Sequence, residues 1–348
     1  MKTEIITEGK SIQEEYLMRP INIKKDYDEL VPFYDQIFEK ELSAKGVSVR
    51  LFLDDFRRMM PFFKVIGIFS KNFRHTFDGF VYENEEGKIV STVNVGYSGN
   101  YWEIAMVATH PEHRRKGLAK KLIVKSLEHA KTHNAKQCVL EVLEQNDPAY
   151  NLYKKMGFIH FDTMMKLKLE KGNMDSIDKV ELPEGYTIRP RTHDRKTGRA
   201  MYELEDKATP EEVLNFLPVN KLKHQKTFLM RLIRPLFKLI LGAKATKWLV
   251  YSKDKLVGIL FIEIGRSDED CHNMELIIDP DHYEVLTAPL INYALNHIKD
   301  NTKFDLNTIT IIRKSDNNQY KHLKNNGFNV FETNHILGIK LNKKEKED

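Results

Sequence analysis

A short basic loop lies at residues 114–119, where the sequence reads Arg-Arg-Lys-Gly-Leu-Ala. The apolar stretch before it ends at His110-Pro111, which predicts that a strand stops there and that an amphipathic helix follows to about Lys131. The first amides of a helix have no partner inside the helix, and the helix dipole places positive charge at the same point. Gly117 lets an anion come close to the backbone. The loop is therefore predicted to bind a phosphate or diphosphate.

A second motif begins at Asn146 and reads Asn-Asp-Pro-Ala-Tyr-Asn-Leu-Tyr-Lys-Lys-Met-Gly-Phe. Residues 137–143 before it are predicted to form a strand. Asp147 and Pro148 suit the start of a helix, and Gly157 suits its end. The motif therefore predicts a strand followed directly by a helix over residues 146–156.

Together the two motifs resemble those of the GNAT superfamily of N-acetyltransferases. Residues 114–119 are similar to the family's (Q/R)-x-x-G-x-(G/A) diphosphate loop, with Ala119 in the place of the commoner glycine. Residues 146–158 are similar to its second signature, N-x-x-A-x-x-L-Y-x-x-x-G-F. The resemblance implies acetyl-CoA as the cosubstrate. It also implies an α/β (α+β) fold, in which a mixed, mostly antiparallel twisted sheet is flanked by helices.

The resemblance assigns cofactor contacts to the strand, the loop and the second motif. Backbone groups of Val107 and Thr109 would bind the pantetheine arm as an added strand does, and the amide of Val107 could polarise the thioester carbonyl. Asn146 would hydrogen-bond the same arm, although an asparagine there also suits a simple helix N-cap. The expected cofactor-binding residues are Val107, Ala108, Thr109, Arg114, Arg115, Lys116, Gly117, Leu118, Ala119 and Asn146.

Two residues are candidates for proton transfer. Tyr153 aligns with the tyrosine that protonates the departing CoA thiolate in many family members, and the alternative is a tyrosine packed in the core. Glu103 lies four residues before Val107, where several family members carry a general-base glutamate. An acceptor ammonium must lose a proton before it attacks the thioester, and a carboxylate can take that proton. An ordinary exposed strand glutamate is the alternative for Glu103.

The chain also repeats itself at a spacing of about 170 residues. Arg19-Pro20 recurs as Arg189-Pro190, and Gly157-Phe158 recurs as Gly327-Phe328. Similarity at a fixed spacing indicates duplicated structural units. We therefore expect a catalytic N-terminal domain at 1–171, a linker at 172–183, a degenerate C-terminal GNAT-like domain at 184–341 and a disordered tail at 342–348.

The expected elements follow the same duplication. The first half is predicted to contain strands at 16–22, 78–83, 88–97, 101–109, 137–143 and 158–169, with helices at 26–41, 48–69, 118–131 and 146–156. The second half is predicted to contain strands at 186–190, 247–252, 255–265, 273–278, 304–312 and 328–341, with helices at 283–299 and 316–326.

The two halves differ where the chemistry would occur. At the loop position the second half carries Glu284 in place of Arg115 and Leu286 in place of Gly117. An acidic and a bulky side chain would repel a diphosphate and block its approach. At the second motif Leu323 replaces Tyr153. We expect one CoA site per chain, in the N-terminal domain.

Composition places further bounds on the class of protein. The 348 residues carry a net charge of +5 and only two cysteines, Cys138 and Cys271. These numbers fit a cytoplasmic protein that binds anionic ligands, without nucleic acid and without stable membrane insertion. A monomer or homodimer is expected. His110, His113, His129 and His133 do not form a convincing metal set, because no acidic third ligand is evident near His129 and His133, so no metal is expected.

Two apolar-basic segments, residues 57–69 and 231–241, allow more than one interpretation. Each could be a core helix beside the acceptor cleft, or a surface for a membrane or lipid substrate. Asp54, Asp55 and Glu83 could attract a cationic amine.

The function expected from the sequence is N-acetyl transfer from acetyl-CoA to a primary amine of a small molecule or peptide, without a covalent enzyme intermediate. Two alternatives remain. One is transfer from another acyl-CoA, as in tandem GNAT proteins that resemble mycothiol synthase. The other is a non-catalytic CoA-binding or sensor protein.

Overall fold

The computed structural model describes residues 15–44, 54, 57, 75, 78–174, 181–224, 244–268 and 270–341. Its contacts divide the chain into two compact units, Met1–Leu140 with Lys340–Asp348, and Glu141–Ile339. The predicted helix at 48–69, except for residues 54 and 57, lies outside the described residues, as do Asp55, the segment at 231–241 and the tail at 342–348.

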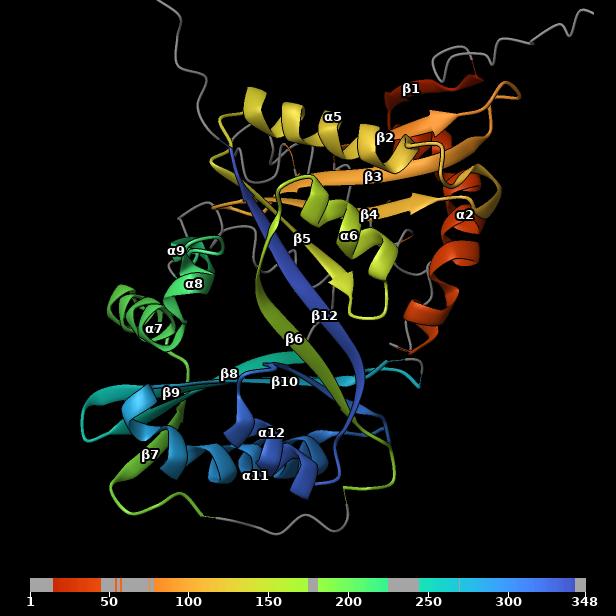
Figure 1. Ribbon diagram of the computed structural model, residues 1–348. Coiled ribbons are helices and arrows are strands. Elements are labelled where there is room, and N and C mark those ends of the chain that lie inside the picture. The colour runs from red at the N-terminus through yellow and green to blue at the C-terminus, as the bar shows by residue number, and fades with distance from the viewer. Residues whose placement is uncertain are drawn as a thin grey trace, which may run out of the picture. The chain divides into compact units, whose positions relative to one another are not determined.

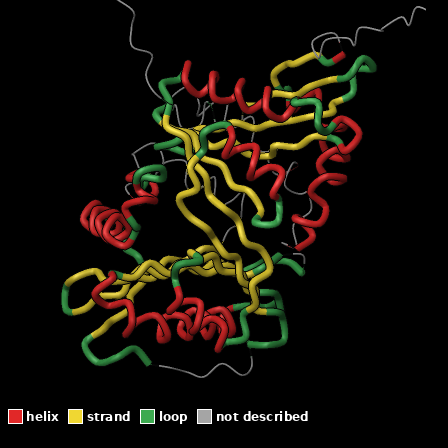
Figure 2. Tube along the Cα trace, viewed as in Figure 1, coloured by secondary structure: helices red, strands yellow, loops and turns green. Residues whose placement is uncertain are grey.

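The described part of the first unit contains the strands β1, β2, β3, β4 and β5, which are neighbours in that order (Figures 1 and 2). Neighbouring strands run antiparallel, except that β4 and β5 run parallel from Trp102 to Ile104. The elements are β1 (Leu17–Pro20), α2 (Ile23–Ala44), β2 (Asp78–Glu83), β3 (Ile89–Tyr97), β4 (Trp102–Thr109), η1 (Pro111–His113), α5 (Leu118–Thr132) and β5 (Gln137–Leu143).

Helices α2 and α5 cover opposite faces of this sheet (Figure 1). On β2, Val81 packs with the apolar side of α2, whereas the ring of the preceding residue Phe80 lies 5.7 Å from that of His129 on α5. Side chains alternate between the faces of a strand, which explains why neighbours on β2 contact different helices. The α2 side buries Leu30, Tyr34 and their neighbours against Ile89 and Ala108.

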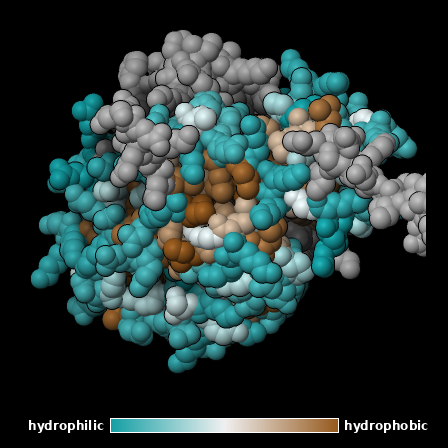
Figure 3. All heavy atoms as spheres, turned by 45° about the horizontal axis from the view of Figure 1, so that its top comes forward, coloured by the Kyte–Doolittle hydropathy of each residue, from teal (hydrophilic) through white to brown (hydrophobic). Residues whose placement is uncertain are grey.

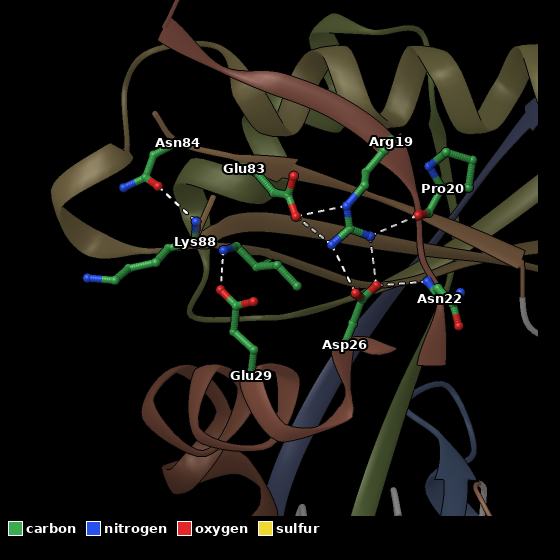
Figure 4. A network of polar contacts seen from close by, with 9 residues as sticks. Arg19, Pro20, Asn22, Asp26, Glu29, Glu83, Asn84 and Lys88 are labelled. Atoms are coloured by element: carbon green, nitrogen blue, oxygen red, sulfur yellow. Dashed lines mark hydrogen bonds and ion pairs between the residues drawn. The ribbon is translucent and has the colours of Figure 1, made fainter. Parts of the chain in front are cut away.

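Arg19 joins β1, β2 and the start of α2 (Figure 4). Its guanidinium donates to both oxygens of Asp26, at 2.8 and 2.9 Å, and to Oε1 of Glu83, at 2.8 and 2.6 Å. Asp26 is 2% exposed and also accepts a hydrogen bond from the amide of Asn22. These contacts raise the pKa of Arg19, with Asp26 as the main cause. The planar guanidinium is required because only it can bind two carboxylates side by side.

Arg19→Lys keeps the charge and removes the fork of donors. We expect the first unit to lose about 1–2 kcal/mol of unfolding free energy, because buried acceptors on Asp26 lose charged hydrogen bonds. Urea unfolding measures the loss. The repeat counterpart Arg189 is exposed and lies 4.8 Å from the ring of Tyr251, so Arg189→Lys is the matched control with a smaller expected loss. An equal loss in both variants would contradict this role of Arg19.

The second unit is built on a seven-stranded sheet in the order β12-β6-β11-β10-β9-β8-β7. Only the β10–β11 pair is parallel. The elements are α6 (Asp147–Lys155), β6 (Ile159–Leu169), β7 (Tyr186–Pro190), α7 (Arg195–Ala208), α8 (Glu211–Leu214), α9 (Lys221–His224), β8 (Lys244–Ser252), β9 (Lys255–Ile264), β10 (His272–Ile278), η2 (Pro280–His282), α11 (Tyr283–Asn301), β11 (Thr308–Arg313), α12 (Asn317–Asn325) and β12 (Asn329–Lys340).

Strand β6 crosses the boundary that the sequence repeat suggests. It belongs to the first repeat, yet it pairs antiparallel with β11 on one side and β12 on the other, for example at Leu167 with Thr310 and Val330. The compact units therefore follow the strand pairing and not the repeat. The domain ranges 1–171 and 184–341 with a linker at 172–183 stay a prediction. The mixed, mostly antiparallel α/β architecture predicted from the sequence is confirmed.

Each unit has an apolar interior. The face seen in Figure 3 is hydrophilic around a hydrophobic area in its middle. In the second unit α11 buries Leu290, Ile291 and Leu295 against β9 and β10. The sequence predicted the helix α11, but it did not predict the helices α7, α8 and α9. Among the described residues, the large hydrophobic side chains that remain exposed come from six different elements: Leu17, Val124, Ile159, Val285, Ile311 and Val330. No described helix is long and apolar enough to span a bilayer.

Candidate active site

Strand β4 contains a bulge at Met106. Ala105 and Ala108 pair with Asn94 and Thr92 of β3, so two residues of β4 lie opposite one residue of β3. Met106, in the bulge, has φ of 51°. A bulge of this kind reverses which face the following side chains occupy. Trp102 contacts His129 of α5, whereas Ala108, an even number of residues later, packs on the α2 side. The bulge therefore re-aims the last part of β4 just before the basic loop.

After the bulge, one side of the β4 backbone is paired with β3, and the other side lies beyond the pairing with β5, which runs from Trp102 to Ile104. The amide of His110 donates to the carbonyl of Val90, and Ala108 lies opposite Thr92 in the same register. Backbone groups alternate in direction along a strand, so those of Val107 and Thr109 point away from β3. This is the edge at which the sequence predicts the pantetheine arm.

The loop after β4 exposes amides at the start of α5. Arg115 has φ of 66° and Gly117 has φ of 78°, and Gly117 caps the helix without a side chain. Among the described residues, none accepts a hydrogen bond from the first three amides of α5, those of Leu118, Ala119 and Lys120. A Cβ on Gly117 would meet nothing within 4 Å, so the space beside this residue is open. Amides without acceptors at a helix N-terminus are groups that can bind an anion, and the diphosphate site stays a prediction.

The three basic side chains of the loop are held differently. Arg114 is exposed and its Nε donates to the carbonyl of Thr109 at 3.1 Å, which ties the loop to the end of β4. Arg115 is exposed as well, and no described residue pairs with its guanidinium. Both arginines can face an anion in solvent.

Lys116 already has a carboxylate partner. Its Nζ donates to Oε1 of Glu15 at 2.7 Å and to the hydroxyl of Tyr16 at 2.6 Å. The hydrogen bond to Glu15 raises the pKa of Lys116, and the same contact lowers the pKa of Glu15. The charge of Lys116 is therefore shared with Glu15, which the sequence analysis did not foresee. The diphosphate contact predicted for Lys116 stays a prediction.

Glu103 is half-buried on β4 and faces the α2 side of the sheet. Its neighbour Trp102 faces α5, and consecutive strand residues face opposite sides. The same side carries Asn94, whose Oδ1 accepts a hydrogen bond from the hydroxyl of Tyr34 at 3.5 Å. Glu103 thus lies before the bulge, on a face with other polar groups.

The residues of the second motif lie in the second unit. Asn146 caps α6, with its Oδ1 accepting from the amide of Ala149 at 3.3 Å, so the capping alternative is observed and the amide nitrogen of its side chain remains available. Tyr153 is 4% exposed, and burial raises the pKa of its phenol to about 12. No described residue forms a hydrogen bond with its hydroxyl. Tyr153 is therefore protonated at neutral pH and keeps a donor for a ligand.

The second half lacks both the bulge in the strand and the glycine loop that follows it. The register of β9 with β10 is regular, without the bulge found in β4. Helix α11 begins at Tyr283, the position that matches Arg114 in the repeat, so a helical turn replaces the glycine loop. Leu323, which stands where Tyr153 does, is fully buried. These differences extend the contrast predicted from Glu284 and Leu286.

A carboxylate occupies the turn of the second half. Asp279 is 1% exposed, caps the turn through the amide of Asp281 and pairs with Lys207 at 2.6 Å and Lys255 at 3.1 Å. Burial by itself would raise the pKa of Asp279, but the hydrogen bonds from Lys207, the amide and Lys255 outweigh it and lower the pKa to about 2. The turn of the second half is therefore held by a buried carboxylate with two lysine partners, a feature that the loop of the first half does not share.

The lowered pKa of Asp279 predicts a pH-dependent contribution to stability. Its folded pKa lies below the unfolded value of 3.8, so the stabilisation is complete above about pH 4 and is lost as the pH falls towards 2. We expect Asp279→Asn to cost about 1–2 kcal/mol at pH 7 and almost nothing at pH 2. Urea unfolding of both proteins at the two pH values measures this. A difference that is the same at both values would contradict the assignment.

One contact of the loop recurs in both halves. The hydroxyl of Tyr16 lies 2.9 Å from Nδ1 of His113, and that of Tyr186 lies 2.8 Å from Nδ1 of His282, with edge-on rings in each pair. The sequence analysis missed this pair. The signal was present, because both residues recur at the spacing of the repeat.

Comparison with known proteins adds family evidence to this geometry. Residues 47–158 match the sequence model described as the Acetyltransferase (GNAT) family. A stretch of 70 residues is 33% identical to N-alpha-acetyltransferase 30 of Saccharomyces cerevisiae, covering 20% of this chain and 40% of the yeast protein. The match therefore spans less than half the length of that relative.

Solved structures match nearly the whole chain. A tandem GNAT protein from the clavulanic acid biosynthesis pathway has a TM-score of 0.61 at 12% identity, over 94% of this chain and 98% of that one. A GCN5-related N-acetyltransferase from Sphaerobacter thermophilus has a TM-score of 0.64 at 13% identity, over 93% and 95% of the two chains. At such identities the likeness establishes the fold.

The fold is shared with tandem GNAT proteins of solved structure. The sequence match to the GNAT acetyltransferase family covers residues 47–158, which contain both motifs, and it confirms the resemblance inferred from them.

Proposed function

We propose that the chain is an acetyl-CoA-dependent N-acetyltransferase with its cofactor loop in the first unit. The observation that supports this most strongly is the start of α5, where three amides without described acceptors meet Arg114 and Arg115. Amides and positive charge at one helix end suit the diphosphate of CoA. The strand edge at Val107 and Thr109 suits the amide groups of the pantetheine arm.

The proposed reaction is direct transfer. The amine nitrogen attacks the thioester carbonyl, the new C–N bond forms, and the C–S bond breaks to release the CoA thiolate. Glu103 takes the proton that the acceptor ammonium must lose, directly or through water. Tyr153 donates its proton to the sulfur as negative charge develops there, since its raised pKa of about 12 keeps the phenol protonated before the reaction. The second proton, which the nitrogen loses as the amide forms, returns the Tyr153 phenolate to the phenol through solvent.

The acceptor is proposed only as a primary amine. The yeast relative is named for acetylation of N-terminal α-amino groups, so short peptides with free N-termini form the first acceptor set. One solved structure with this fold contains a glucosamine N-acetyltransferase region, at 13% identity and a TM-score of 0.61 over 97% of this chain and 40% of that one. Amino sugars therefore form the second set, and polyamines complete the panel.

The test is an acceptor screen that measures release of free thiol from acetyl-CoA. We expect release above the no-acceptor rate with at least one amine class, and mass spectrometry should find the acetyl group on the amine. Succinyl-CoA and myristoyl-CoA in the same screen decide between donors. Tight binding of acetyl-CoA without turnover on the whole panel would support a CoA sensor and contradict the proposed transfer.

Other expectations from the sequence stay predictions. They are the cytoplasmic location, the monomeric or homodimeric state and the absence of a nucleic-acid partner.

A further inference from the structure

A cluster of three histidines lies at the far end of α5 from the basic loop. His129 belongs to the last turn of α5, His133 caps its C-terminus, and His75 precedes β2. One nitrogen from each ring lies within 4.8 Å of the corresponding nitrogens of the other two. The ring centroids of His75 and His133 are 4.1 Å apart, and those of His129 and His133 are 4.5 Å apart.

Asp78 supplies a carboxylate to this cluster. Its Oδ2 lies 2.8 Å from Nδ1 of His75 and 2.7 Å from Nε2 of His129. The sequence analysis dismissed His129 and His133 as metal ligands because no acidic residue was evident nearby, and that premise was wrong. The sequence held no sign of the contact, because β2 and α5 are separated by 34 residues and meet only in the folded sheet.

The hydrogen bonds leave one lone pair on each ring. A neutral imidazole carries one N–H and one acceptor nitrogen. His75 and His129 direct an N–H at Asp78, and Nδ1 of His133 lies 2.9 Å from the carbonyl oxygen of His129, to which it donates. The second nitrogen of each ring is then an acceptor, and no described residue donates to it. Histidines that bind metals are held in this way, with the other N–H on a carboxylate or carbonyl.

The surroundings favour a cation. The C-terminal end of a helix carries partial negative charge, and His129 and His133 lie at that end of α5. Asp78 adds a carboxylate beside two of the three rings.

We propose that His75, His129 and His133 bind one divalent transition-metal ion of the zinc class, with Asp78 as the residue that positions two of the rings. Imidazole nitrogens suit zinc, cobalt and nickel. The site joins α5 to Asp78 at the start of β2 and to His75, three residues earlier. Along α5 it lies roughly 18 Å from Gly117, at about 1.5 Å per residue. Its role is thus to fix the helix that begins with the anion loop, and it is independent of the proposed acetyl transfer.

Titration of the metal-free protein with Co²⁺ tests the site. We expect one Co²⁺ per chain, with the visible absorption of a low-coordinate cobalt site and a rise in melting temperature. Trp102 provides a second readout, because its ring lies 5.5–5.7 Å from all three imidazoles and only two tryptophans exist in the chain. Competition with Zn²⁺ should abolish the absorption.

Variants test whether Co²⁺ binds at these three histidines and not at other histidines of the chain. His129→Ala/His133→Ala should weaken Co²⁺ binding by about 100-fold or more, and Asp78→Asn by about 10-fold or more. His322→Ala is the control, since His322 lies on α12 and belongs to neither of the two groups of described residues that could hold a metal ion, and binding should be unchanged. If the double variant fails to fold, His133→Ala alone decides, because His133 is exposed. Absence of saturable binding in the wild type, or equal binding in the histidine variants, would overturn the proposal.

Discussion

Gly117→Val is expected to weaken acetyl-CoA binding by about 100-fold, equal to about 2.8 kcal/mol. Gly117 has φ of 78°, a conformation that a β-branched residue adopts only with strain. The added side chain would also occupy the open space beside Gly117, where the proposed diphosphate approaches. Isothermal titration with acetyl-CoA or CoA measures the loss.

Gly87 offers a matched control for this substitution. It has φ of 74° in the turn between β2 and β3, and a Cβ there would also meet nothing within 4 Å. Gly87→Val should therefore cost similar stability through backbone strain and leave CoA affinity unchanged. Equal affinities for the two variants would show that the diphosphate does not bind at Gly117.

Tyr153→Phe is expected to lower kcat by about 1,000-fold while the affinity for acetyl-CoA changes by less than about 2-fold. The substitution removes only the hydroxyl, which has no hydrogen-bond partner among the described residues, so packing of the buried ring against Phe158 is kept. Thermal unfolding should show an unchanged melting temperature. Stopped-flow thiol release with the best acceptor from the screen measures the rate.

Tyr320→Phe is the control for that experiment. Tyr320 occupies on α12 the position that Tyr150 occupies on α6, and it packs against the core of the second unit. Its loss of a hydroxyl should leave kcat within about 2-fold of the wild type. A Tyr153→Phe protein that turns over as fast as the wild type would remove Tyr153 from the mechanism.

The duplicated halves show what the loop requires beyond the fold. Both halves keep the turn after the fourth strand and the tyrosine–histidine contact. Only the first half adds the bulge at Met106, the positive φ angles at Arg115 and Gly117, and a turn without a buried carboxylate. Asp279 with its two lysine partners stabilises the second turn by ion pairs that have no counterpart in the first. The fold is therefore common to both halves, and the site is not.

The sequence by itself determined the local structure. The bounds predicted for β2 and β5 agree with those observed, and α5 and α6 begin within a residue or two of the predicted positions. These features depend on side-chain alternation, helix caps and glycine, whose effects act over a few residues. The two motifs identified the family for the same reason, since each is a continuous stretch of chain.

Only the tertiary structure decided which distant residues meet. The contact of Lys116 with Glu15, the pairing of β6 with β11 and β12, and the contact of Asp78 with His129 each join positions at least 51 residues apart. No spacing in the sequence encodes such contacts, because they depend on the order of strands in a sheet and on which helix covers each face. The same residue types would be ordinary surface groups in another topology.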